Sequence, residues 1–152
     1  MSQLSAFHRR FEIRWADLDA NSHVRHSAYL DFPAQVRVSY FNSHGFSVRK
    51  MQELGVGPIL FNESVEYRRE IRDSELIDVD VALMGLSENK KHWYLRHQIF
   101  KESGELAAVL LCRGAWIDLN ARRVCAAPDG LYDSMLAMSR TDDFAWLNSS
   151  KA

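Results

Sequence analysis

The residues whose types and spacing could do chemistry gather in one short polar stretch. It contains Asp17, Asp19, Asn21, Ser22, His23, Arg25 and His26. An apolar helical pattern follows, and a helix start carries unsatisfied N–H groups and partial positive charge. Such an end keeps a carboxylate ionised and stabilises an oxyanion. The stretch therefore combines a possible nucleophile or base with a possible oxyanion hole.

Two other interpretations of this stretch stay open from the residues alone. Asp and Asn before a helix are ordinary caps, and two nearby histidines can belong to a solvated first turn. Asp17, Asp19, His23 and His26 also offer metal-ligand types at close spacing, although the pattern matches no zinc motif. The sequence contains no GxSxG, P-loop or GxGxxG motif.

Two elements must position this stretch. Residues 7–15 alternate between apolar and polar side chains, which predicts a half-buried strand. After the stretch, apolar residues from Tyr29 to Tyr40 recur at spacings of three and four, which predicts a helix with a wide apolar face. Gly45 suits the end of this helix. Pro33 lies inside it and predicts a kink or a shortened first turn.

The rest of the chain predicts an antiparallel sheet. Short turns join the expected strands and make neighbours antiparallel, and the long helix needs a sheet to bury its apolar face. A short helix is expected after Pro128. The predicted fold class is α+β, a curved antiparallel sheet wrapped round one central helix. The later strands are expected at residues 59–69, 76–86, 92–101 and 106–118.

Length and composition limit the function classes. The chain has 152 residues and a mass of 17.5 kDa, which favours one domain, expected over residues 1–138 with a loosely ordered C-terminal tail over 139–152. A net charge of −1 gives no whole-chain basic footprint for nucleic acid. No apolar run is long enough for a membrane span, and the N-terminus has no secretory pattern. Only two cysteines are present, so we expect a cytoplasmic protein.

Residues 13–32 resemble the signature of 4-hydroxybenzoyl-CoA thioesterase-like proteins of the hotdog superfamily. That signature runs approximately Asp-x-Asp-x-x-Gly-His-Val-x-[Asn/His]-x-x-Tyr-Leu, and this chain matches it from Asp17 to Leu30. Ser22 stands in place of the usual glycine, and Pro33 begins a segment that carries glutamates in a related subgroup. The resemblance implies a hotdog fold, with about five strands round one long central helix.

The resemblance also implies roles for individual residues. Asp19 matches the aspartate that attacks the thioester carbonyl or activates a water that does. The backbone N–H of His26 matches an oxyanion donor, and its imidazole would orient water or substrate. His23 matches the histidine of the signature, and Asp17 is expected to order the loop.

The resemblance implies three groups of substrate-binding residues. Two basic groups would meet the phosphates of coenzyme A. One lies in a turn, and the other lies at the end of the strand expected over 59–69, with Arg72 as a further member of that patch. The third group would line an acyl pocket beside the helix at a subunit boundary. In that order, the residues are Lys90 and Lys91; Arg68 and Arg69; and Tyr29, Phe61 and Asn62.

The implied activity is that of an acyl-CoA thioesterase, which releases a carboxylate and free coenzyme A. The implied assembly is a homodimer or homotetramer with shared active sites. No metal and no cofactor are expected, since coenzyme A is part of the substrate. The alternative is a hotdog protein that binds acyl-CoA or acyl-carrier protein without hydrolysis, which the departures at Ser22 and Pro33 keep open. The acyl group is not specified by these residues.

Overall fold

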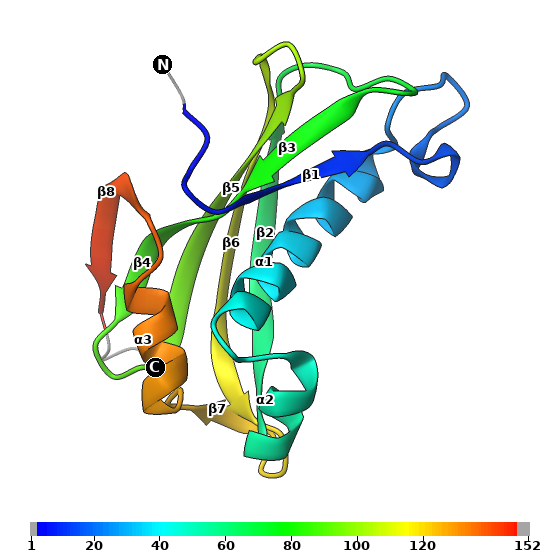
Figure 1. Cartoon of the computed structure of the whole chain (residues 1–152). Helices are drawn as coiled ribbons and strands as arrows, with labels where there is room; N and C mark the ends of the chain where they lie inside the picture. The colour runs from blue at the N-terminus through cyan, green and yellow to red at the C-terminus, as the bar shows by residue number, and fades with distance from the viewer. Residues whose placement is uncertain (1–2, 149–152) are drawn as a thin grey trace.

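The computed structural model describes residues 3–148, which form an α+β unit with one antiparallel-rich sheet (Figure 1). The helices are α1 (Asp31–Ser43), α2 (Val48–Leu54) and α3 (Asp129–Leu136), with short 3-10 helices at Trp15–Asp17 and His26–Leu30. The strands are β1 (His8–Glu12), β2 (Val56–Tyr67), β3 (Leu76–Asp80), β4 (Ala82–Ser87), β5 (His92–Lys101), β6 (Leu106–Asp118), β7 (Arg123–Cys125) and β8 (Arg140–Leu147).

The sheet is built around β5 and β6. Strand β6 pairs with β2 along one side, and with β5 followed by β7 along the other. On its second side β5 pairs with β3 towards one end and with β4 towards the other, so these two short strands follow one another along it. Strand β1 pairs with β3 in antiparallel orientation, and β8 pairs with β4 in parallel orientation. Within the described residues β2 pairs with β6 only, so its outer edge is unpaired.

The sheet has eight strands, so the prediction of about five was wrong. The expected strand over 76–86 is divided at Val81 into β3 and β4. Strand β7 is too short to show an alternating pattern. Strand β8 lies in the segment expected to be a loose tail, and it is held there by its ladder with β4. The last residues of that tail, 149–152, lie outside the described part.

Helix α1 packs against one face of the sheet because its apolar side chains face that way. Val36 is fully buried, Phe32 meets Phe11 of β1 at 5.3 Å between ring centroids, and Tyr40 meets Phe7 at 5.1 Å. The α-helix begins at Asp31, later than the periodicity suggested, because residues 26–30 form a 3-10 helix. Pro33 is thus the third residue of α1, inside the first turn, where an N–H is not needed for α-helical bonding.

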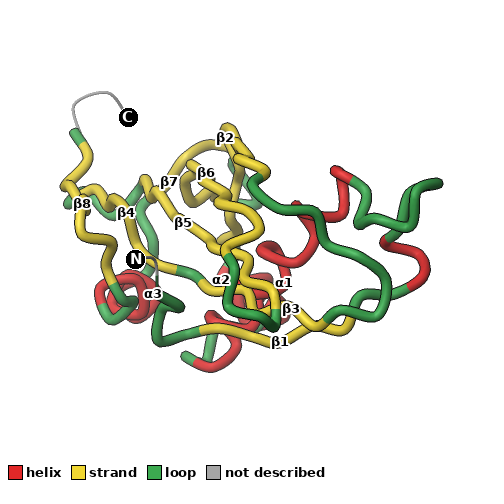
Figure 2. Tube along the Cα trace, turned by 90° about the horizontal axis from the view of Figure 1, so that it is seen from above, coloured by secondary structure: helices red, strands yellow, loops and turns green. Residues whose placement is uncertain are grey.

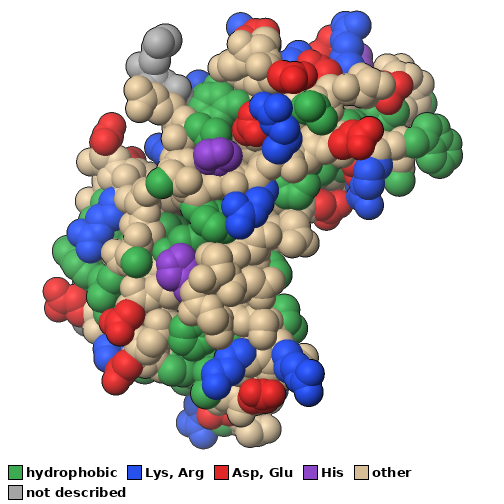
Figure 3. Space-filling model, viewed as in Figure 1, with side chains coloured by type: hydrophobic (Ala, Val, Ile, Leu, Met, Phe, Trp, Pro, Cys, Tyr) green, Lys and Arg blue, Asp and Glu red, His purple; other side chains and the backbone are tan. Residues whose placement is uncertain are grey.

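The loop that carries the polar stretch and the C-terminal elements lie on opposite sides of the molecule. Figures 1 and 2 show the loop between β1 and α1 at one side, and α3 with β8 at the opposite side. Charged side chains of both signs are scattered over the face in Figure 3, in keeping with a net charge of −1. Among the described helices, none is long and apolar enough to cross a membrane.

Candidate active site

The loop between β1 and α1 is closed around the carboxylate of Asp19. Its Oδ1 accepts hydrogen bonds from the backbone N–H groups of Asn21 (2.8 Å) and His23 (3.1 Å). These bonds lower the pKa of Asp19 below its ordinary value, so the exposed side chain is ionised at neutral pH. Since both bonds go to Oδ1, Oδ2 is left to face a ligand.

Backbone bonds make this loop a tight turn. The N–H of Asp19 donates to the carbonyl of His23 at 2.7 Å, and the N–H of Ser22 donates to the carbonyl of Asp19 at 3.1 Å. Ser22 lies in the left-handed region, with φ of 62°. The family's usual glycine adopts this conformation without strain, and serine does so at a cost.

Asp17 does not reach the ligand side of the loop. Its side chain is fully buried and accepts hydrogen bonds from the Arg14 guanidinium (2.8 Å to Oδ1) and from the Arg14 backbone N–H (2.9 Å to Oδ2). These bonds outweigh burial and lower the pKa of Asp17. The N–H of Arg25 donates to the Asp17 carbonyl at 2.8 Å. Asp17 therefore ties the two ends of the loop together.

A shallow pocket of about 400 Å³ opens beside Asp19. The loop, the 3-10 helix and the end of β2 supply its walls. Six of the residues predicted from the sequence line it, namely Asp19, His23, His26, Tyr29, Arg68 and Arg69. The structure thus brings the expected carboxylate, both histidines and two of the expected cations to one place.

The pocket lies at the N-terminal end of the helical segment. His26 is the first residue of the 3-10 helix, which runs directly into α1. The first N–H groups of such a segment have no partners within it and carry partial positive charge. His26 itself lines the pocket, so this partial positive charge lies beside it.

Three pocket residues were not predicted as site residues, namely the apolar Val24 and the polar Tyr67 and Glu70. The Tyr67 hydroxyl donates to the His26 carbonyl at 3.3 Å, and its ring meets Tyr29 edge-on at 4.9 Å. A Glu70 oxygen lies 3.1 Å from Nε2 of His23. Their only signal in the sequence was their place at the end of a strand expected to carry a phosphate patch. Glu70 also pairs with Arg72, which lowers the Glu70 pKa.

Arg68 and Arg69 flank the pocket on exposed backbone just after β2. Arg68 pairs with Glu66 at 2.9 Å and Arg69 with Glu105 at 3.2 Å. Both side chains remain about half exposed, so these pairs are screened by water and can exchange for another anion. The two cations also border a smaller recess next to the pocket.

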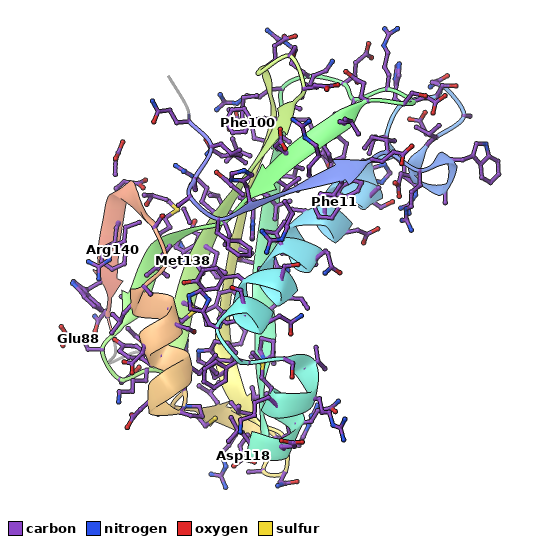
Figure 4. All side chains as sticks on the ribbon, in the orientation of Figure 1. Phe11, Glu88, Phe100, Asp118, Met138 and Arg140 are labelled. Atoms are coloured by element: carbon purple, nitrogen blue, oxygen red, sulfur yellow. The ribbon has the colours of Figure 1, made fainter. Side chains whose placement is uncertain are left out.

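Lys90 and Lys91 lie away from this pocket in a single chain. They belong to the turn between β4 and β5, close to Glu88, which Figure 4 labels at the side opposite the Asp19 loop. Lys90 pairs with Asp129 of α3 at 2.7 Å, which raises the pKa of Lys90. The turn is basic as predicted, but within one copy of the chain it does not line the Asp19 pocket.

Phe61 and Asn62 also lie apart from the pocket, near the middle of β2. Phe61 is half exposed and lines a separate recess with His92, whose ring centroid is 6.1 Å away. Asn62 is exposed and follows an irregularity in the ladder between β2 and β6. Of the three predicted acyl-pocket residues, only Tyr29 reaches the Asp19 pocket.

The metal interpretation gains no support from this geometry. Asp17 is engaged by Arg14, and Asp19 by backbone N–H groups. Over residues 3–148, no group of three His, Cys, Asp or Glu side chains is arranged to hold a metal ion.

A second and larger recess, of about 560 Å³, lies between α1, α2 and the sheet. Phe41, Met51, Trp93 and Trp116 give it an apolar wall. We call it the helix–sheet cavity. Sequence reasoning did not predict this cavity.

The fold and the pocket together define an α+β protein with a polar site at a helix start. The family model of the thioesterase-like superfamily matches residues 13–135, and the chain belongs to that superfamily. This confirms the relationship expected from the Asp17–Leu30 signature.

The individual proteins to which the chain is similar have low sequence identity to it. A curated protein of Aquifex aeolicus (strain VF5), called "Putative esterase", is 28% identical over 78 residues, which cover 51% of this chain and 61% of that protein. The chain thus matches less than two thirds of this relative's length. A Staphylococcus aureus protein solved in complex with CoA has a TM-score of 0.81 at 19% identity, covering 93% of this chain and 90% of that one. A 1,4-dihydroxy-2-naphthoyl-CoA thioesterase from Synechocystis has a TM-score of 0.78 at 16% identity, covering 86% and 96%.

Proposed function

We propose that this protein is an acyl-CoA thioesterase. The observation that carries the proposal is the Asp19 carboxylate, held by two backbone N–H groups in a pocket at the N-terminal end of the helical segment. Membership of the thioesterase-like superfamily supports it. The S. aureus structure with CoA supports a coenzyme A ligand for this fold.

In the proposed reaction, Asp19 acts on the thioester carbonyl through Oδ2. Either it attacks the carbonyl carbon and forms a mixed anhydride that water then opens, or it takes a proton from the attacking water. The carbonyl oxygen becomes negative in both routes, and the N–H groups near His26 would stabilise it. His23, held by Glu70, would orient the water. The carbon–sulfur bond breaks, and the thiolate of coenzyme A leaves and takes up a proton.

The assembly we propose is a dimer formed along β2. This strand has 12 residues, most of them exposed, and its outer edge is unpaired in the described chain. Unpaired strand edges are ready to add another strand, and a two-fold axis gives an antiparallel, self-complementary pairing. Such a pairing places the start of β2 in one copy beside the end of β2 in the other, next to the Asp19 pocket. Pairs of dimers would give the tetramer.

This dimer also gives Lys90 and Lys91 a role. The N–H of Trp116 donates to the carbonyl of Lys91 at 3.0 Å, and Trp116 lies opposite Pro58 in the ladder of β2 and β6. The lysine turn is therefore at the same end of the sheet as the start of β2. We propose that one copy brings its lysines towards the pocket of the other, where they and Arg68 and Arg69 hold the phosphates of coenzyme A. Phe61 and Asn62, near the middle of β2, would then lie at the subunit boundary.

The test is thiol release from a panel of aromatic and aliphatic acyl-CoAs by the wild type and Asp19→Asn. Asparagine has the same size but lacks the charge, so we expect the rate to fall by about 100-fold or more, or about 2.7 kcal/mol of barrier. Asp142→Asn is the control, because Asp142 is exposed on β8, which lies at the side of the molecule opposite the Asp19 loop (Figure 1).

Equal thiol release by wild type and Asp19→Asn would contradict the role of Asp19. Saturable binding of acyl-CoA by the wild type, without any thiol released, would instead support the alternative of a non-hydrolytic binding protein.

A further inference from the structure

The helix–sheet cavity contains a positively charged side chain, and its lining includes no acidic side chain to balance that charge. Its wall is apolar except for Arg37 of α1 and Gln52 of α2 among the polar side chains, with Trp93 contributing an indole. The volume of about 560 Å³ is in the range of pockets that bind small molecules. The Asp19 pocket shares none of these residues.

The Arg37 guanidinium is half-buried and is positioned by two neutral groups. Its Nη1 lies 3.1 Å from Nε2 of His97 and 3.5 Å from Sγ of Cys112. Within the described residues it pairs with no carboxylate. Glu63, opposite Cys112 in the ladder, is the nearby acid, and it is exposed on β2. A guanidinium has five N–H donors, so most of them remain available.

His97 is neutral and fixed in one tautomer. Its Nδ1 lies 2.7 Å from the backbone carbonyl of Asp80, which can only accept, so Nδ1 carries the proton. Nε2 therefore accepts from Arg37. Complete burial and the Arg37 charge lower the pKa of His97 to about 3. Burial likewise raises the pKa of the Cys112 thiol to about 11, so neither neighbour supplies a negative charge to Arg37.

Trp93, which lines the same cavity, carries a buried donor without an acceptor. The indole N–H of Trp93 is buried and has no hydrogen-bond partner. Buried donors that lack partners are rare, and they point to a missing water or ligand. The lining thus combines a large apolar surface, one unbalanced cation and one unsatisfied donor, and no carboxylate.

We propose that the helix–sheet cavity binds an apolar group that carries a carboxylate, and that Arg37 pairs with this carboxylate. The apolar part of the ligand fits the wall of aromatic and aliphatic side chains. The carboxylate accepts from the guanidinium that His97 holds in place, an ion pair that is strong because it is partly shielded from water. The site does not depend on the proposed thioesterase activity.

The test is calorimetric titration with 4-phenylbutyrate and with its amide, which has the same shape and no charge. For the wild type we expect the carboxylate to bind at least about tenfold more tightly than the amide, a difference of about 1.4 kcal/mol. In Arg37→Met the unbranched side chain keeps much of the packing, so the amide should bind as before and the preference for the carboxylate should disappear. Arg49→Met, an exposed arginine of α2, is the control and should behave as the wild type.

Equal affinity for acid and amide in the wild type, or no binding of either, would overturn the proposal. The second result is also expected if another copy of the chain fills the cavity. If Arg37→Met fails to fold, Arg37→Lys keeps the charge and should keep the preference, while Ala34→Phe, in the cavity wall, should weaken both ligands.

Two sources of the carboxylate are distinguished in a separate arm. The first is a free carboxylic acid, and the second is the far end of an acyl group joined to coenzyme A. We would compare the KM values for glutaryl-CoA and pentanoyl-CoA in the wild type and in Arg37→Met. We would also repeat the titration with 4-phenylbutyrate in Asp19→Asn. A lower KM for glutaryl-CoA that Arg37→Met removes assigns the site to the acyl end of a substrate. Unchanged KM values, with 4-phenylbutyrate still bound, assign it to a free acid.

Discussion

The Asp19 pocket and the helix–sheet cavity obtain their charges in opposite ways. In the pocket, a carboxylate at the surface is held by backbone N–H groups, and the lining mixes polar and apolar side chains. In the cavity, a guanidinium among apolar side chains is held by a neutral imidazole. The first arrangement leaves the charged group open to water and to a reacting carbonyl. The second keeps a cation without a counter-ion, which favours an anionic ligand.

The largest effect we expect comes from pH and separates the two regions. His97 has a lowered pKa in the folded chain, so the unfolded chain binds more protons below pH 6.5. Its contribution to stability is complete above that pH and declines as the pH falls towards about 3. Between pH 7 and pH 5 the free energy of unfolding should fall by about 2 kcal/mol. Urea unfolding at a series of pH values measures this change.

The same titration should give no signal from Asp19 in that range. Asp19 also has a lowered pKa, but its contribution is present above the ordinary aspartate pKa of 3.8 and is lost only as the pH falls through the lower folded value. Stability that stayed constant from pH 7 to pH 5 would contradict a neutral, buried His97. His97→Gln removes the buried ring, so the fall in stability between pH 7 and pH 5 should become much smaller in this variant.

A second prediction concerns the imidazole of His23. In His23→Gln the backbone N–H that holds Asp19 remains, so any loss reports on the ring alone. We expect kcat/KM for thioester hydrolysis to fall about tenfold, or about 1.4 kcal/mol, because the ring held by Glu70 no longer orients water. Binding of 4-phenylbutyrate in the helix–sheet cavity should not change. A parallel loss of both would mean that the two regions are coupled.

A smaller effect is expected from the lysine turn. Replacing Lys90 and Lys91 together by glutamine should raise KM for acyl-CoA by about fivefold, since exposed charge pairs contribute about 1 kcal/mol or less. The value of kcat should be unchanged. Lys50→Gln, on α2, serves as the control because Lys50 is also exposed. A KM that is the same in the double variant and the wild type would remove the lysines from the proposed phosphate site.

The smallest effect should follow Ser22→Gly. Glycine accepts a φ of 62° without strain, and its greater freedom in the unfolded chain offsets part of the gain. The net increase in the free energy of unfolding should be about 0.5 kcal/mol. Thermal unfolding measures it, with Ser74→Gly, which also has positive φ, for comparison. A decrease in stability would show that the Ser22 side chain supports the loop.

Local patterns predicted most elements of this fold, and long-range pairing decided the rest. Alternation and helical spacing located β1, α1 and the later strands, because one face of each is buried. The break at Val81 has no such signal, since Val81 is as buried as its neighbours and only the change of pairing along β5 reveals it. Strand β8 has a short mixed sequence and is fixed by β4, more than fifty residues earlier in the chain.

The candidate site shows the same limit. The Asp17–Leu30 signature was sufficient to predict Asp19, His23 and His26, which lie close together in sequence. Glu70 joins them only because the chain returns past the loop, where His23 forms a bridge with Arg72. Arg37 could not be recognised from the sequence, because a cation on a helix is usually solvated. Its meaning depends on His97 and Cys112, which come from two different strands.

The open edge of β2 has a consequence for the newly made chain. Until something covers it, twelve residues present unpaired backbone groups, the kind of template on which aggregates grow. Pro58 lacks an N–H, and Glu63 and Glu66 place negative charge along the strand. These residues act as gatekeepers, since they disfavour random strand addition while leaving an ordered, two-fold partner acceptable. Solubility and assembly would thus be controlled by one strand.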